Sequence, residues 1–240
     1  MDSIISKYNS LLKDILGDFA MKWDPEKSNA NFKKDVQKFY GFQNEFGWNI
    51  LLNAFYVLDD TEFAKESFNN FSFQGPSRHQ DTGERYLRLY GLLNALYQQK
   101  IAIENLLEIH KISNKKQIID SLTNLEITKL RNKIAAHPSN YKPESESDYK
   151  FDVYEISRPD LMSDKITLLK NQNDFEYLDD FKSSIDEFDA IIINSLSLIS
   201  VKVITKLFNN QGKKFELRSK PEKLKNGGFE FLGEIITFKK

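Results

Sequence analysis

The chain of 240 residues carries 34 basic and 35 acidic side chains, for a formal net charge of −1. A hydrophobic content of 40% is sufficient for a globular core, and the balanced charge excludes a protein that coats nucleic acid through a general positive field. Cysteine, a long apolar run and a leader pattern are all absent, which predicts a cytoplasmic protein without disulfides, thiolate chemistry or a membrane span.

The first half of the chain has the apolar periodicity of long amphipathic helices. Apolar residues recur three and four positions apart from residue 4 to residue 19, which predicts a first helix. A second helix is expected from residue 31 to residue 58, with Asn31 as its cap. Acids, Asn and Phe are mixed at residues 59–83, which indicates a loop with at most one short helix. A long central helix is expected from Gly83 to His110.

The second half alternates between helical and strand patterns. Residues 113–137 again have helical spacing, and Pro138 predicts an end to this helix because proline disfavours helical dihedral angles in the residue before it. The following ten residues are rich in Ser, Pro, Glu and Asn, which is typical of a loop. Alternating apolar residues then predict a β-hairpin at about residues 151–170. Helix is expected again from about Phe175 to Asn209.

The predicted architecture is therefore mostly α-helical: a helical bundle over residues 1–210, interrupted by the hairpin. Residues 211–240 are expected to form a basic, β-rich appendage, because their aromatic and branched residues lie among glycines and charges. The basic side chains of this appendage either contact nucleic acid or form an ordinary solvated surface, and the sequence leaves both readings open.

The segment from Arg131 to Pro138, with the sequence RNKIAAHP, carries the chemistry. Arginine offers a planar, permanently charged fork for phosphate oxygens, and an imidazole takes and gives protons near neutral pH. On an ideal α-helix, six positions place Arg131 and His137 about 120° apart and ~9 Å along the axis. Either the arginine side chain swings round or the backbone departs from ideal geometry, and in both cases a phosphate fits between the two side chains.

This string resembles the Arg-to-His signature of HEPN domains, with five residues between Arg131 and His137. The resemblance is specific over about a dozen residues. It implies a helical bundle that dimerises, in whose active members the Arg and His of two protomers form a metal-independent endoribonuclease, commonly a toxin or an antiviral abortive-infection effector. Other HEPN-like domains are inactive, so the alternative is a dimeric module that binds RNA, a nucleotide or a protein partner.

In the catalytic interpretation, His137 transfers a proton at the 2′-hydroxyl or the leaving 5′-oxygen, and Arg131 stabilises the charge that develops on the phosphate. The Asn132 amide has two possible roles. It binds the imidazole or the phosphate, or it is an ordinary helix amide without a catalytic role. One histidine cannot serve both ends of the reaction, which favours a symmetric dimer. Local RNA contacts are expected from the basic side chains around the motif, namely Lys129, Lys133 and Lys142.

The sequence shows neither grouped metal ligands nor a phosphate-binding glycine loop, so we expect no metal and no cofactor. Tyr141 is a candidate regulatory residue. Some HEPN toxins similar to this chain are silenced by an antitoxin, a nucleotidyltransferase that modifies a tyrosine shortly after the motif histidine. Tyr141 follows His137 by four positions, which is longer than the spacing of that system, and the alternative is an ordinary loop tyrosine.

Overall fold

The computed structural model is mostly α-helical and contains a small three-stranded antiparallel sheet, so the predicted fold class is confirmed at that level. It describes residues 3–20, 34, 37–38, 40–42, 46–77, 81–136, 138, 141, 151–178, 180–208, 211–226, 229–231 and 234–236. The chain divides into two compact units, Met1–Glu62 with Gln99–Ile119 and Asp189–Lys240, and Phe63–Gln98 with Asp120–Phe188. The division into residues 1–210 and 211–240 stays a prediction.

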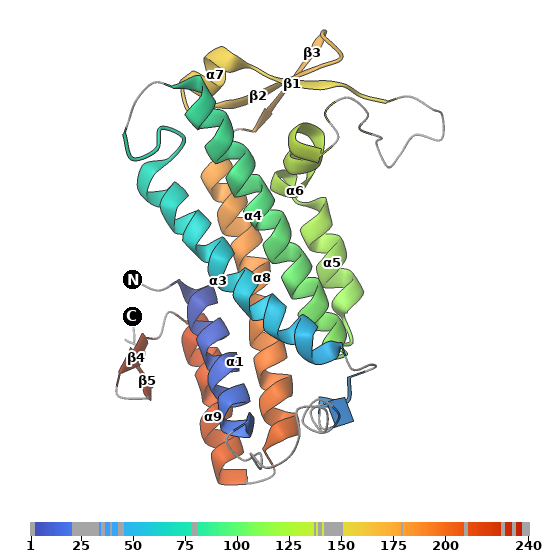
Figure 1. Ribbon diagram of the computed structural model, residues 1–240, viewed down its shortest axis with the longest axis vertical. Helices are drawn as coiled ribbons and strands as arrows, with labels where there is room; N and C mark the ends of the chain where they lie inside the picture. The colour runs from blue at the N-terminus through green and yellow to red at the C-terminus, as the bar shows by residue number, and fades with distance from the viewer. Residues whose placement is uncertain are drawn as a thin grey trace. The chain divides into compact units, whose positions relative to one another are not determined.

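Long helices build both units (Figure 1). They are α1 (Ile4–Ala20), α3 (Gly47–Phe71), α4 (Thr82–Ile109), α5 (Lys115–Asn124), α8 (Phe181–Leu207) and α9 (Gln211–Lys225). In the first unit their apolar stripes bury Ile5, Tyr8, Leu58, Leu106, Ile192 and Ile199 almost completely. Among the described residues, α8 is the one helix that is long and apolar enough to cross a membrane. The core helix of a soluble protein meets the same criteria of length and composition.

In the second unit, α6 (Glu126–Arg131) leads directly into a π-helix, η1 (Asn132–Ala136). The sheet follows, with β1 (Tyr154–Ile156), β2 (Ile166–Lys170) and β3 (Asp174–Leu178) in that spatial order and both pairings antiparallel. A short helix, α7 (Arg158–Met162), lies between the first two strands. Arg85, in the first turns of α4, donates to the Leu161 carbonyl, and this contact ties α7 to that end of α4 (Figure 1).

Helix α3 corrects the prediction of a loop at residues 59–83. The helix continues through the first part of this segment, to Phe71, although its residues Thr61 and Glu62 are polar and buried. Gln99 of α4 donates to both side chains, at 3.1 and 2.7 Å, so burial leaves these acceptors satisfied and the helix is not interrupted. The predicted start of this helix at residue 31 lies outside the described residues.

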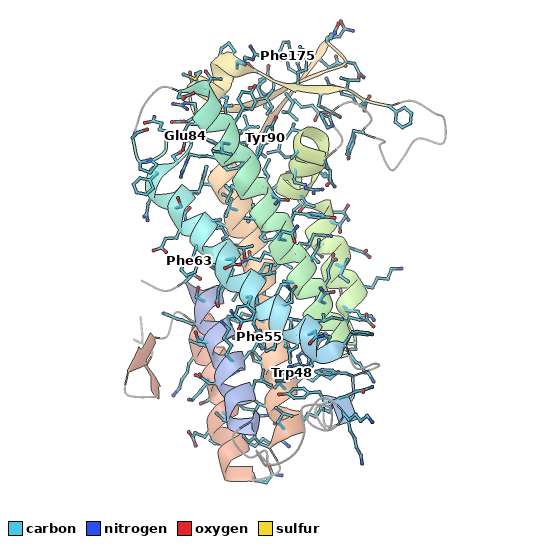
Figure 2. All side chains as sticks on the ribbon, in the orientation of Figure 1. Trp48, Phe55, Phe63, Glu84, Tyr90 and Phe175 are labelled. Atoms are coloured by element: carbon cyan, nitrogen blue, oxygen red, sulfur yellow. The ribbon has the colours of Figure 1, made fainter. Side chains whose placement is uncertain are left out.

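The region after residue 150 differs from the predicted hairpin in two respects. Helix α7 separates the two expected strands, and β3 occupies residues where a helix was expected to begin. Asn171 and Gln172 have φ values of 50° and 63°, the conformation of a tight turn that joins antiparallel strands. Phe175, labelled in Figure 2, and Tyr177 then project as an exposed pair with ring centroids 6.4 Å apart, which shows the two-residue period of a strand.

The C-terminal segment, which was expected to be β-rich, begins with a helix that the sequence analysis did not predict. Helix α9 forms because Leu217 and Leu224, seven residues apart, share one buried face. The hydroxyl of Tyr8 on α1 donates to the carbonyl of Pro221 on this helix. The short β segment at the end is confirmed, because β4 (Phe229–Phe231) pairs antiparallel with β5 (Glu234–Ile236).

Candidate active site around Arg131

Arg131 ends α6, and the next five residues form a π-helical turn. The backbone from Asn132 to Ala136 therefore departs from α-helical geometry, and such a departure is one of the two arrangements that the sequence spacing required. Ile134, in the middle of the turn, is 4% exposed and anchors it in the second unit. Turns of this type are rare, and they occur frequently at functional sites. Here the π-helical turn lies within the motif.

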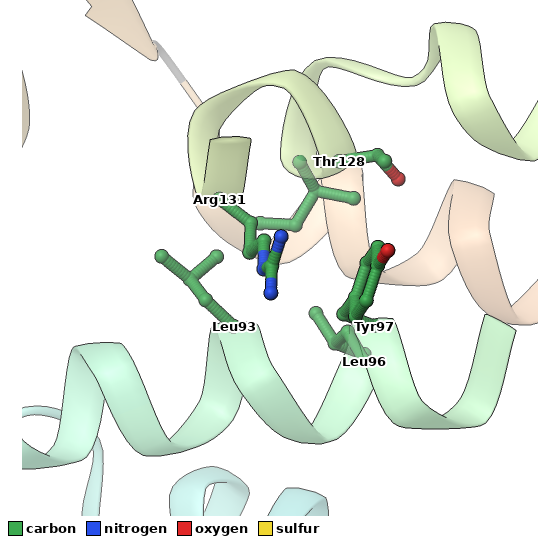
Figure 3. A pocket seen from close by; sticks show the side chains of 6 residues that line it. Leu93, Leu96, Tyr97, Thr128 and Arg131 are labelled. Carbon is green, nitrogen blue, oxygen red and sulfur yellow. The ribbon is translucent and has the colours of Figure 1, made fainter. Parts of the chain in front are cut away.

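The guanidinium of Arg131 lies flat against an aromatic ring of α4. Its central carbon is 3.7 Å from the centroid of the Tyr97 ring, and Figure 3 shows the group between Tyr97 and Leu93. A cation–π contact of this kind stabilises the pair by roughly 0.5–2 kcal/mol, more as water is excluded. The Nη1 atom also donates to Oδ1 of the neighbouring Asn132, at 3.1 Å. Two contacts thus orient the arginine without neutralising it.

Arg131 has no acidic partner among the described residues, and its buried Nε atom has no hydrogen-bond acceptor. Two other arginines of this unit, Arg85 and Arg88, lie beside a carboxylate. Arg85 is 1% exposed and pairs with Asp164 at 2.5 Å, whereas Arg88 lies 3.8 Å from Glu84. A half-buried cation without a counter-ion retains its full attraction for an anionic ligand, and a guanidinium binds phosphate with two parallel hydrogen bonds.

A small pocket lies beside the guanidinium, lined by Leu93, Leu96, Tyr97, Ile127, Thr128 and Arg131 (Figure 3). The Thr128 hydroxyl already donates to the Leu122 carbonyl at 2.7 Å, and Arg131 is the one charged residue of the lining. The open space is about that of a single water molecule, too small for a nucleobase. The guanidinium of Arg131 forms part of the pocket wall.

The lysines of the motif occupy two different environments. Lys129 forms an exposed ion pair with Glu126 at 3.2 Å, which contributes little stability and is readily exchanged for another anion. The ammonium of Lys133, with its side chain 15% exposed, pairs with Glu176 of β3. His137 and Lys142 lie outside the described residues. The described part of the motif therefore brings together Arg131 and Asn132, and it directs Lys133 toward the sheet.

Tyr141 is tied to the beginning of the sheet. Its backbone exchanges two hydrogen bonds with Asp152, of 3.2 and 2.8 Å, and its ring meets Tyr154 edge-on with centroids 5.6 Å apart. Burial is the largest cause of a raised pKa at Tyr154, and the carboxylates of Glu176 and Asp152 raise that pKa further. Tyr141 is partly exposed, so its placement leaves its regulatory role a prediction.

Two residues of this site were not identified from the sequence. Tyr97 has the spacing of an ordinary apolar-face residue on α4, and Glu176 stands between two aromatic residues in a segment expected to be helical. Their roles arise from contacts between segments that are far apart in the sequence. The spacing of apolar residues along the chain does not indicate such contacts.

The described residues contain no group of three or more His, Cys, Asp or Glu side chains that could hold a metal ion. No protein-family model, curated protein or solved structure matches the chain. The function of the site is therefore interpreted from its own residues.

Proposed function

We propose that this protein is a HEPN-like endoribonuclease that cuts RNA by attack of the 2′-hydroxyl, without a metal or cofactor. The observation that carries the proposal is the guanidinium of Arg131, held on Tyr97 without an acidic partner among the described residues, directly before a π-helical turn. An oriented, uncompensated guanidinium is suited to a phosphodiester, and His137, six positions on, supplies the proton transfer that cleavage requires.

The chemistry needs a base at the 2′-hydroxyl, an acid at the leaving 5′-oxygen and a cation for the phosphate between them. Assistance by His137 would contribute ~10²–10⁴ in rate, and Arg131 would add electrostatic stabilisation of the transition state. A two-fold homodimer would supply one His137 to each side of the phosphate. Asn132, which accepts from Arg131, would keep the guanidinium and the start of the turn in register.

RNA recognition would be local because the net charge is −1. Lys129 and Lys142 remain the proposed phosphate contacts, and looped or single-stranded RNA would be preferred because duplex RNA resists in-line attack. In the cell this activity would suit a cytoplasmic toxin or abortive-infection effector, restrained by an antitoxin or released by an activating partner. Modification of Tyr141 by such an antitoxin is part of the proposal.

The alternative is a catalytically inactive HEPN-like dimeric module that binds RNA, a nucleotide or a protein partner. One contact favours it: Glu176 neutralises Lys133, which removes one of the three cations expected to bind RNA. Such a module would bind a single-stranded RNA without shortening it, so that binding and turnover measured on the same oligonucleotide separate the two functions.

The test is digestion of a single-stranded RNA, and of DNA with the same sequence, in excess chelator, followed by analysis of the product ends. We expect RNA to be cut, DNA to be spared, and the upstream fragment to end in a 2′,3′-cyclic phosphate, because the nucleophile is the substrate's own hydroxyl. Loss of all cleavage in chelator, or a product with a 3′-hydroxyl, would contradict the mechanism. Binding without cleavage would favour the alternative.

A further inference from the structure

A carboxylate of the sheet, that of Glu176 on β3, contacts the motif. One of its oxygens accepts from the ammonium of Lys133 and the other accepts from the hydroxyl of Tyr154 at 3.2 Å. The ammonium of Lys133 also lies 5.1 Å from the centroid of the Tyr154 ring. These three side chains, here called the Glu176 clamp, join β1, β3 and the π-helical turn within the second unit.

The clamp reaches the chain on both sides of His137. Lys133 lies inside the π-helical turn, four positions before the histidine. On the other side, the backbone N–H of Tyr154 donates to the carbonyl of Pro138 at 2.8 Å. The same β1 residue therefore binds Glu176 through its side chain and residue 138 through its backbone. Displacement of this sheet edge would loosen both attachments together.

The energetics distinguish this clamp from an ordinary surface pair. Exposed ion pairs contribute little to stability. The Lys133 side chain, however, is only 15% exposed, so removal of Glu176 would leave a largely desolvated charge without its partner. A π-helical turn is also uncommon and lasts where surrounding contacts maintain it. Lys133 is the turn's charged attachment to the sheet, so Glu176 contributes directly to the geometry of the motif.

We infer that Glu176 is a positioning residue, which acts through Lys133 and Tyr154 to hold the π-helical turn and residue 138 in the arrangement that the motif requires. The inference rests on the proposed function for its catalytic consequence, while its structural consequence is measured separately. Misplacement of catalytic groups by about 1 Å can cost ~10²-fold in rate. Glu176 thus affects turnover more than substrate binding.

The test compares Glu176→Gln with the matched control Glu155→Gln, which changes an exposed carboxylate on strand β1 of the same sheet. In RNA cleavage we expect Glu176→Gln to lower kcat by at least about 10-fold with KM within about 2-fold, and the control to match the wild type. Hydrogen exchange at residues 132–136 should accelerate in Glu176→Gln and stay unchanged in the control. A merely structural carboxylate would lower the unfolding temperature and leave kcat of the folded protein intact.

A double variant tests the route of the effect. Lys133→Gln should lower kcat as Glu176→Gln does, and combining the two should add little, because both remove one contact. Should Glu176→Gln fail to fold, Tyr154→Phe removes its hydrogen bond alone and should give a smaller effect of the same kind. Parental kcat in Glu176→Gln, or unchanged exchange at residues 132–136, overturns the inference. A wild type that does not cut RNA refutes the proposed function, and the exchange result then decides the inference alone.

Discussion

The guanidinium carbon of Arg131 lies 3.7 Å from the centroid of the Tyr97 ring, so among the described residues an aromatic face, and not a carboxylate, orients this cation. The distinction matters for phosphate binding. A carboxylate would neutralise the charge and compete with the substrate for the same N–H groups, whereas a ring attracts the cation through its quadrupole and leaves those donors available.

Replacement of Tyr97 should affect activity according to whether a ring remains. Tyr97→Phe keeps the face on which the guanidinium lies and should stay within about 3-fold of the parental rate, whereas Tyr97→Leu should lose about 10-fold or more. Steady-state cleavage of a single-stranded RNA measures both, with circular dichroism as a check on folding. Equal rates for Tyr97→Leu and the wild type would show that the contact has no role in the reaction.

Replacement of Arg131 should show the need for its planar fork. Arg131→Ala should lose at least ~10²-fold in kcat/KM, and Arg131→Lys should recover a small part, because an ammonium supplies charge without the stacked, bidentate geometry. Arg158→Ala is the control, since Arg158 is exposed in the same unit. If Arg131→Lys cleaves as fast as the wild type, charge alone is sufficient and the geometric argument is wrong.

The active species should be a symmetric dimer. Ala135 is small and exposed on the π-helical turn, so another copy can approach the motif closely, and the reaction needs two proton-transfer groups. Light scattering at assay concentration should give twice the chain mass of 28.0 kDa. A protein that is monomeric and fully active under the same conditions would exclude the composite site.

Stability should fall in mild acid because of His110. Burial is the main cause that lowers the pKa of this imidazole to about 4, and the charges of Lys206 and Lys202 lower it further. The unfolded chain, with a pKa of ~6.5, binds the proton first as the pH falls, so the stabilisation is complete above pH ~6.5 and is lost toward pH 4. Urea unfolding should show a loss on the order of 2 kcal/mol across this window.

His110→Gln should flatten that dependence, because an amide does not titrate. Urea unfolding of this variant at pH 7.0, 5.5 and 4.5 isolates the contribution of the imidazole. An unchanged slope relative to the wild type would assign the acid sensitivity to other groups.

Elements with an uninterrupted apolar face could be predicted from the sequence. The helix expected at Gly83 to His110 is α4, Thr82–Ile109, because a continuous stripe leaves no alternative. Prediction failed where a tertiary contact decides the outcome. In α3, polar residues that suggested a loop are buried and accept hydrogen bonds from Gln99. In α9, burial of Leu217 and Leu224 on one face stabilises a helix where β structure was expected.

The site divides in the same way. Arg131 and Asn132 are recognisable because their chemistry and spacing are local, and the departure from ideal helix geometry was one of two expected solutions. Tyr97 and Glu176 come from segments remote in sequence, and nothing in their own neighbourhoods marks them. Neutralisation of Lys133 depends on the register of β3, which places Glu176 across from Leu168 and was not predictable from a segment expected to be helical.

The most direct test of the proposed ribonuclease site is the cleavage rate of His137→Ala on single-stranded RNA in excess chelator. The controls are the wild type and His79→Ala, which removes a histidine outside the motif. We expect His137→Ala to stay folded and to lose at least ~10²-fold in rate, because the proton-transfer group is gone, and His79→Ala to cut at the parental rate. Cleavage by His137→Ala at the parental rate would contradict the assignment of this motif as a ribonuclease site.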